Sequence, residues 1–122
     1  MNCLIIEDEP KNILLIKKYN EMLGFNSFEV IDETPSVALA VKSFLKNKPD
    51  LILMDIHLAD GTGFDFFENI QDYDAHTFVT IFITGYEQYA INAIKHAPVD
   101  YLVKPFGFEE FAEAIQKAAA KF

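Results

Sequence analysis

The sequence predicts an α/β fold, a doubly wound five-stranded parallel sheet with helices on both faces. Short apolar runs alternate five times with segments that have helical periodicity. The run at 51–54, Leu-Ile-Leu-Met, is continuously apolar, which is typical of a strand buried on both faces. For five strands the common order is 2-1-3-4-5, with its switch point between the first and third strands.

The first half of the chain contains two strand–helix units. Residues 2–6 form an apolar run closed by acids. A helix is expected from Pro10, which the first helical turn tolerates, to Gly24, which favours a helix end. A second strand is expected over 28–31. Residues 34–48 carry apolar side chains at intervals of three and four, which predicts a helix that stops before a proline.

The second half contains three further units. The expected elements are strand 51–55, helix 64–70, a loop over 73–77, strand 78–83, helix 86–95, strand 99–103 and helix 108–122. The strands are rich in β-branched, aliphatic or aromatic residues. The last helix is strongly amphipathic, whereas the helix before it has only the narrow apolar stripe of Ala90, Ala93 and Ile94.

Composition indicates one globular domain over residues 1–122, with 51% hydrophobic residues. The net charge is -9 and all ten basic residues are lysines, which argues against a nucleic-acid surface in this segment. Cys3 has no pairing partner, so disulfides and cysteine metal sites are excluded. The first apolar run is too short for a signal peptide or a membrane span, and we expect a cytoplasmic protein.

Polar side chains follow four of the five predicted strands. Glu7 and Asp8 follow the first strand, Asp55 ends the third, Thr84 follows the fourth and Lys104 follows the last. In the order 2-1-3-4-5 all these positions lie at the same edge of the sheet, where ligands bind in open α/β folds. Each position alone has a plain structural explanation, such as a helix cap or a loop residue. Their coincidence favours a site.

The chemistry of this set points to phosphoryl transfer. Three carboxylates close together require a cation, and oxygen ligands with room for phosphate favour Mg²⁺. Asp55 is the expected nucleophile, because a carboxylate can form an acyl phosphate. Thr84 can hydrogen-bond a phosphoryl oxygen and Lys104 can neutralise its charge.

The remaining polar residues predict no second site. The histidines at 57, 76 and 96 lack metal-ligand spacing and are expected in loops or on the surface. Gly61 and Gly63 are expected to shape a turn, and they do not form a dinucleotide fingerprint.

These residues resemble the receiver domain of two-component response regulators, a flavodoxin-like fold. The resemblance covers the whole chain and rests on Glu7-Asp8, Met54-Asp55, Asp60-Gly61-Thr62-Gly63, Thr84 and Asp100-Tyr101-Leu102-Val103-Lys104-Pro105-Phe106. It implies a signalling domain rather than an enzyme, in which Asp55 takes phosphoryl from the phosphohistidine of a sensor histidine kinase. It also implies Mg²⁺ on Asp8, Asp55 and the backbone carbonyl of His57, with Glu7 acting through water.

The resemblance further implies a switch. Thr84 would move inward on phosphorylation with Tyr101 behind it, which couples the site to helix 86–95, strand 99–103 and the last helix (helix4-strand5-helix5), the usual output or homodimer face. The bond between Lys104 and Pro105 would be cis. Thr84–Ala90 and Asp100–Leu102 look like receivers attached to LytTR-type DNA-binding domains. DNA would then be bound only by an output domain absent from this chain. A stand-alone or phosphorylation-independent receiver is the alternative, and no membrane contact is expected.

Two further expectations concern side chains around the site. Tyr86 is predicted to shield the phosphoryl group and slow its hydrolysis, although Gly85 beside it acts in the opposite direction. Ile13 and Leu14 extend the apolar face of the first helix, either as a wide buried face or as a docking site for the kinase.

Two other classes of protein fit the sequence less well than the receiver. A haloacid-dehalogenase-type phosphatase would need Asp-x-Asp on the first strand, and Asp55 is followed by Ile56-His57. A flavodoxin-like flavin carrier would place phosphate after the first strand, where Glu7-Asp8-Glu9 repels it.

Overall fold

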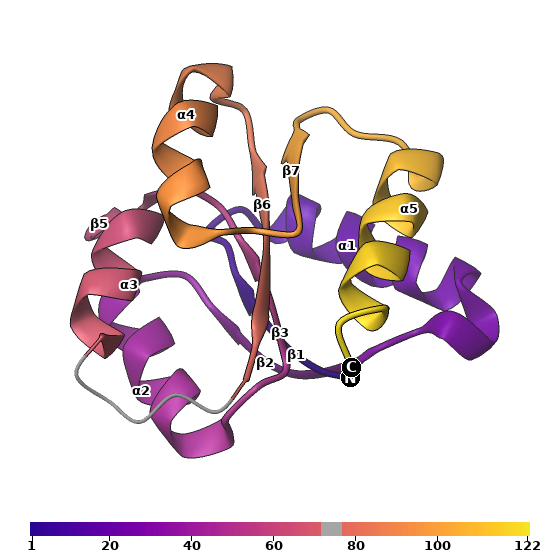
Figure 1. Cartoon of the computed structure of the whole chain (residues 1–122), viewed down its shortest axis with the longest axis horizontal. Coiled ribbons are helices and arrows are strands. Elements are labelled where there is room, and N and C mark those ends of the chain that lie inside the picture. The colour runs from indigo at the N-terminus through magenta and orange to yellow at the C-terminus, as the bar shows by residue number, and fades with distance from the viewer. Residues whose placement is uncertain (72–76) are drawn as a thin grey trace.

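The computed structural model describes residues 1–71 and 77–122 and confirms the predicted parallel sheet. The strand order is β2-β1-β3-β6-β7, which is 2-1-3-4-5 when only the strands of this sheet are counted (Figure 1). Its strands are β1 (Asn2–Ile6), β2 (Glu29–Thr34), β3 (Leu51–Met54), β6 (Val79–Thr84) and β7 (Asp100–Val103). All four neighbouring pairs are parallel, so the carboxyl ends of the strands share one edge.

Helices cover both faces of the sheet (Figure 1). The helical segments are α1 (Pro10–Met22), η1 (Gly24–Asn26), α2 (Val37–Asn47), α3 (Gly63–Ile70), η2 (Glu87–Tyr89), α4 (Ala90–Ala93), η3 (Ile94–His96) and α5 (Phe108–Ala119). Helices α1 and α5 pack on one face, and α2, α3 and α4 pack on the other. The expected loop at 73–77 lies almost wholly outside the described residues.

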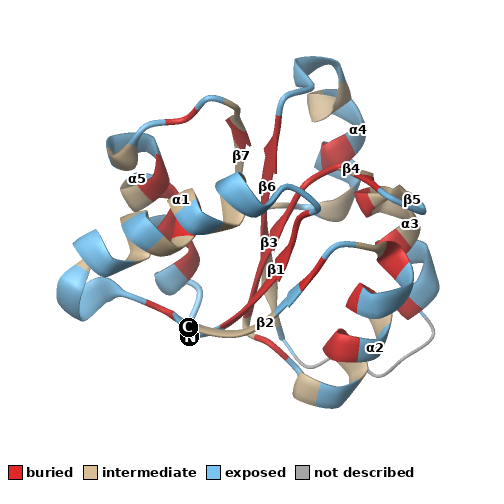
Figure 2. Ribbon diagram, turned by 180° about the vertical axis from the view of Figure 1, so that it is seen from behind, coloured by how far each residue is buried: buried red, intermediate tan, exposed pale blue. Residues whose placement is uncertain are grey.

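The core divides into two layers because side chains alternate along each strand. Cys3 and Ile5 of β1 face the α1–α5 layer, whereas Leu4 and Ile6 face the α2–α3–α4 layer. The inner strands are buried on both faces (Figure 2). Cys3 is fully buried, and its burial raises the pKa of the thiol far above the usual range.

The expected helix 86–95 is present over residues 87–96, but only its middle is α-helical. The segment consists of the 3₁₀ turn η2, a single α-helical turn and the 3₁₀ turn η3. Only Ala93 of the predicted stripe is buried, and Ile94 is 70% exposed. Two small alanines bury too little apolar area to hold a longer helix against the sheet.

Several boundaries also differ from the prediction. Strand β2 continues to Thr34, and α2 begins only at Val37, where the Ser36 hydroxyl accepts a hydrogen bond from the Leu39 amide. A small antiparallel hairpin, β4 (His57–Leu58) and β5 (Gly61–Thr62), was not expected. Each of its strands has only two residues, too few for a periodicity to be visible in the sequence.

The described helices contain none that is both long and apolar enough to cross a membrane.

Candidate functional site

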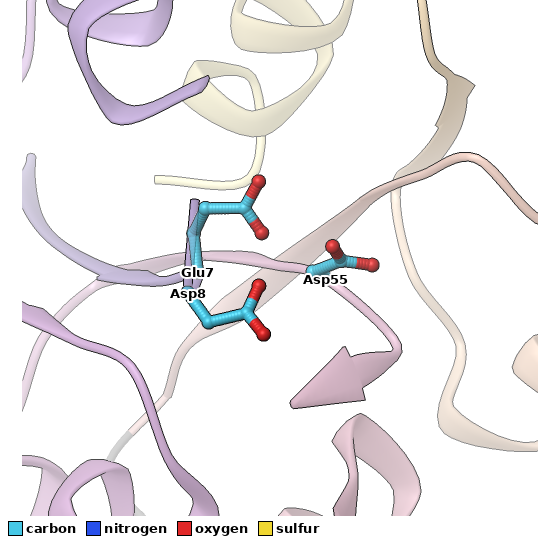
Figure 3. A group of neighbouring side chains, drawn as sticks. All are labelled: Glu7, Asp8 and Asp55. Atoms are coloured by element: carbon cyan, nitrogen blue, oxygen red, sulfur yellow. The ribbon is translucent and has the colours of Figure 1, made fainter. Parts of the chain in front are cut away.

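Three carboxylates meet at the carboxyl edge of the sheet. Ile6 of β1 pairs with Met54 of β3, so the residues that follow these strands are neighbours. One oxygen from each of Glu7, Asp8 and Asp55 lies within 4.8 Å of the others (Figure 3). The predicted acidic cluster is therefore present, and it lies at the switch point between β1 and β3.

The ammonium group of Lys104 enters this cluster from the end of β7. Its Nζ donates hydrogen bonds to Oε1 of Glu7 at 2.6 Å and to Oδ2 of Asp55 at 2.9 Å. The Lys104 amide donates a hydrogen bond to the Thr84 carbonyl oxygen at 2.8 Å, which joins the edge strand β7 to its neighbour β6 beside the site. The Lys104–Pro105 peptide bond is cis, as the resemblance implies.

The ion pair with Glu7 was not foreseen from the sequence. Glu7 is 3% exposed, whereas Asp8 beside it is exposed to solvent. Strand alternation explains the difference, because successive side chains leave β1 on opposite sides. The sequence pattern alone did not show which of the two acids would face the lysine.

Burial and charge shift the titration of the cluster in opposite directions. Burial, together with the neighbouring carboxyl of Asp55, raises the pKa of Glu7 to about 8. Burial also opposes ionisation of Asp55, but interactions with Glu7 and Lys104 hold the pKa of that carboxyl below its ordinary value. Burial lowers the pKa of Lys104, but the carboxylates outweigh it and raise the pKa of the ammonium group. Asp55 is therefore ionised at neutral pH.

Two buried oxygen atoms at the site lack hydrogen-bond partners among the described residues. They are Oε2 of Glu7 and Oγ1 of Thr84, which is fully buried at the end of β6. Buried polar atoms are normally satisfied, so both have unused capacity for an added ligand. The oxygen donors of the cluster are of the type that Mg²⁺ prefers.

Aromatic rings pack around His57, two residues after Asp55. The ring of His57 lies 4.1 Å from that of Tyr86 and 5.2 Å from that of Tyr89, measured between centroids. The hydroxyl of Tyr101 donates a hydrogen bond to the backbone oxygen of Tyr86. Tyr101 also packs against Phe82 of β6, so it connects the loop after β6 to the sheet.

Two of the three histidines make ring contacts that the sequence did not indicate. His57 packs against the rings of Tyr86 and Tyr89, and its Nε2 is buried without a partner among the described residues. His96 stacks on Phe67, with centroids 4.4 Å apart and an interplanar angle of 14°. His76 lies outside the described residues.

The loop after Asp55 is fixed by close packing. The Gly63 amide donates a hydrogen bond to the Ile56 carbonyl oxygen at 2.7 Å. A Cβ atom on Gly63 would lie 2.5 Å from Sδ of Met54 and 2.9 Å from the backbone oxygen of Asp55. Gly63 therefore shapes the turn, as predicted, by allowing this approach. Asp60 has a function that the sequence did not indicate, because it accepts hydrogen bonds from the Val37 and Ala38 amides at the start of α2.

The structure separates the two candidate docking residues of α1. Ile13 is partly buried and packs against the α1–α5 layer of the core. Leu14 is 67% exposed. Ile13 thus belongs in part to the packed face, and Leu14 is the more accessible of the two to a partner.

Comparison with known proteins identifies this arrangement. The response regulator receiver domain matches residues 3–116 of the chain. The chain belongs to this family. The receiver is a signalling module of two-component systems, so the phosphatase and flavin-carrier alternatives fall away. An acidic pocket that binds Mg²⁺ is a property of receivers, and the cluster of Glu7, Asp8 and Asp55 provides one.

Curated relatives confirm the predicted subfamily. The receiver is 33% identical over 123 residues to the sensory transduction protein LytT of Enterococcus faecalis, and 35% identical over 122 residues to the transcriptional regulatory protein LytR of Staphylococcus aureus. Each match covers 98% of this chain and 48% of the relative. The chain therefore spans about half the length of these relatives.

Solved structures show the same fold. The response regulatory domain of protein mrkE from Klebsiella pneumoniae superimposes with a TM-score of 0.87 and 24% identity, covering 99% of this chain and 97% of that one. The receiver domain of PhyR from Erythrobacter litoralis gives a TM-score of 0.78 and 29% identity, covering 98% and 89%.

Proposed function

We propose that Asp55 is the phospho-acceptor of this receiver. The observation that carries the proposal is the contact between Asp55 Oδ2 and Lys104 Nζ at 2.9 Å, inside a cluster with Glu7 and Asp8. Asp55 is ionised, buried and 6% exposed, and a cation is already aimed at one of its oxygens. This is the arrangement that a carboxylate nucleophile needs when its target carries negative charge.

The residues around Asp55 would bind the metal ion and contact the phosphoryl group. Asp8, Asp55 and the backbone carbonyl of His57 would hold Mg²⁺, with Glu7 acting through water. When bound, the ion would neutralise negative charge on the phosphoryl group. An oxygen of Asp55 attacks phosphorus, the new acyl phosphate bond forms, and the bond to the imidazole nitrogen of the donor breaks. Lys104 Nζ and Thr84 Oγ1, which has no partner among the described residues, then contact the phosphoryl oxygens.

The signal leaves the site through Thr84 and Tyr101. Contact of Thr84 with the phosphoryl group would draw the loop after β6 inward. The Tyr101 hydroxyl donates a hydrogen bond to the backbone oxygen of Tyr86 in that loop, so Tyr101 would follow the movement. The affected face is formed by α4, β7 and α5, which would serve an output domain or a homodimer. Ile91 and Ile94 are 79% and 70% exposed there, which gives the face apolar contact area.

The partners follow from the family and the relatives. The donor would be a sensor histidine kinase, and residues 1–122 would act as one receiver domain in the cytoplasm. Because one relative is named a transcriptional regulatory protein, we infer that the output is a LytTR-type transcription factor, with DNA bound only by that output domain. The alternative is a receiver that acts alone or without phosphorylation.

Incubation with Mg²⁺ and a small phosphodonor tests the proposal. The intact mass should rise by one phosphoryl group in the wild type and remain unchanged in Asp55→Asn. Beryllofluoride should change the hydrodynamic size only if the α4–β7–α5 face forms a dimer. Phosphorylation that persists in Asp55→Asn would exclude Asp55 as the acceptor.

A further inference from the structure

An open apolar groove lies beside α5, on the face of the sheet that α1 and α5 cover. It has a volume of about 580 Å³ and is lined by η1, Met1 and one side of α5. It shares no residue with the cluster of Glu7, Asp8 and Asp55. A role in phosphoryl transfer therefore does not account for it.

Phe25 stands at the rim of this groove and is fully exposed. Its relative exposure is 109%, the highest among the large exposed apolar residues of the described chain. Gly24 before it has φ +61°, a left-handed conformation that turns the chain sharply out of α1. Phe25 lines the groove together with the apolar side chains of Phe108, Ala112 and Ile115. Grouped apolar side chains of this kind mark an interaction surface more often than single ones do.

The charges of the groove indicate what can cover it. Glu109 and Glu113 are the acidic side chains in its lining, which includes no lysine side chain. Lys117 lies 4.0 Å from Glu113, but its ammonium group is also bonded to Asp100 at 3.1 Å. A second copy of the chain would bring the same carboxylates and a net charge of -9 against it. A partner with basic side chains would instead be attracted both to these carboxylates and to the net negative charge of the chain.

We propose that this groove docks a basic amphipathic helix of a protein partner, with apolar anchors against Phe25 and lysine or arginine side chains facing Glu109 and Glu113. Amphipathic helices present anchors at i, i+3 or i+4, and i+7, which suits an elongated apolar groove along a helix. The docking does not depend on Asp55, so it goes beyond phosphoryl acceptance.

A pair of synthetic peptides tests the proposal on the full chain. One peptide carries leucines at helical spacing flanked by lysines, and the other replaces each lysine with glutamate. Amide chemical-shift titration should show the basic peptide binding at η1 and α5, more tightly at low salt. Phe25→Ser should weaken binding about ten-fold, because a fully exposed anchor is lost without a change in the fold. The variant's amide spectrum checks that the fold is intact.

A matched charge reversal separates docking from general attraction to an acidic protein. Glu113→Lys should weaken the basic peptide several-fold, whereas Glu68→Lys on α3, with the same change in net charge, should not. Equal effects of the two variants would overturn the proposal, as would equal binding of the acidic peptide or shifts centred on Glu7 and Asp8. Self-association that Phe25→Ser abolishes would also overturn it, since a second copy would then occupy the groove.

Discussion

The ammonium group of Lys104 lies 2.6 Å from Oε1 of Glu7, closer than it lies to the carboxylate of Asp55 at 2.9 Å. Lys104→Met should therefore lower the free energy of unfolding at neutral pH by about 1–3 kcal/mol, because two buried carboxyl groups lose their shared donor. Urea unfolding measures the loss. Added Mg²⁺ should stabilise the variant, since the cluster still offers its oxygens. Equal stability of variant and wild type would show that the lysine does not hold the cluster.

Tyr86 tests the aromatic packing around His57. Tyr86→Ala should speed hydrolysis of the phosphorylated protein several-fold, because it removes the ring that packs on His57, two residues after Asp55. Tyr86→Phe keeps the ring and should decay like the wild type. Loss of phosphoprotein over time, followed by intact mass, gives both rates. An unchanged rate in Tyr86→Ala would mean that water reaches the site by another path.

Leu14 tests docking of the kinase. Leu14→Glu should lower transfer from a cognate kinase about ten-fold, as loss of an interface anchor does. Its stability should change by no more than about 0.5 kcal/mol, because the side chain is exposed. Phosphorylation by a small donor should survive. Ile13→Glu is the contrasting variant and should destabilise the fold by about 1–3 kcal/mol, since Ile13 packs on the core.

Two glycines provide a matched test of the turn after Asp55. Gly63→Ala should cost about 1–3 kcal/mol, because a Cβ there meets Met54 and the backbone of Asp55. It should also slow phosphorylation by displacing Asp55. Gly85→Ala has no atom within 4 Å of the added Cβ and should leave the unfolding free energy within about 0.5 kcal/mol. Similar effects from both substitutions would contradict the packing argument.

The titration of His96 should account for part of the pH dependence of the free energy of unfolding. Partial burial, followed by the charge of Lys95, lowers the pKa of His96 in the folded state. The unfolded chain then binds the proton first, so stability is lost as the pH falls below the ordinary value of 6.5. Chemical unfolding from about pH 8 down to about pH 5 should show a smaller loss in His96→Phe, which keeps the stack on Phe67. A loss as large as in the wild type would remove His96 from this account.

The sheet was predictable because each inner strand is a short, mainly apolar run, and because five alternating strand–helix units leave few topologies. The polar ends of those strands could be placed at one edge by the same reasoning. The pairing of Lys104 with Glu7 rather than Asp8 could not, since it depends on which side each residue leaves β1. The division of helix 86–95 into short turns was not predicted either. Its expected apolar stripe included Ile94, and the fold leaves that side chain exposed.

The single cysteine gives the molecule a built-in reporter. Cys3 has no exposed surface in the folded chain, and its thiol resists ionisation there. A thiol reagent can therefore modify it only when β1 leaves the sheet, so the labelling rate reports on the opening of that strand. A second cysteine introduced at the surface would react much faster, and a fluorophore could be attached there without first replacing Cys3.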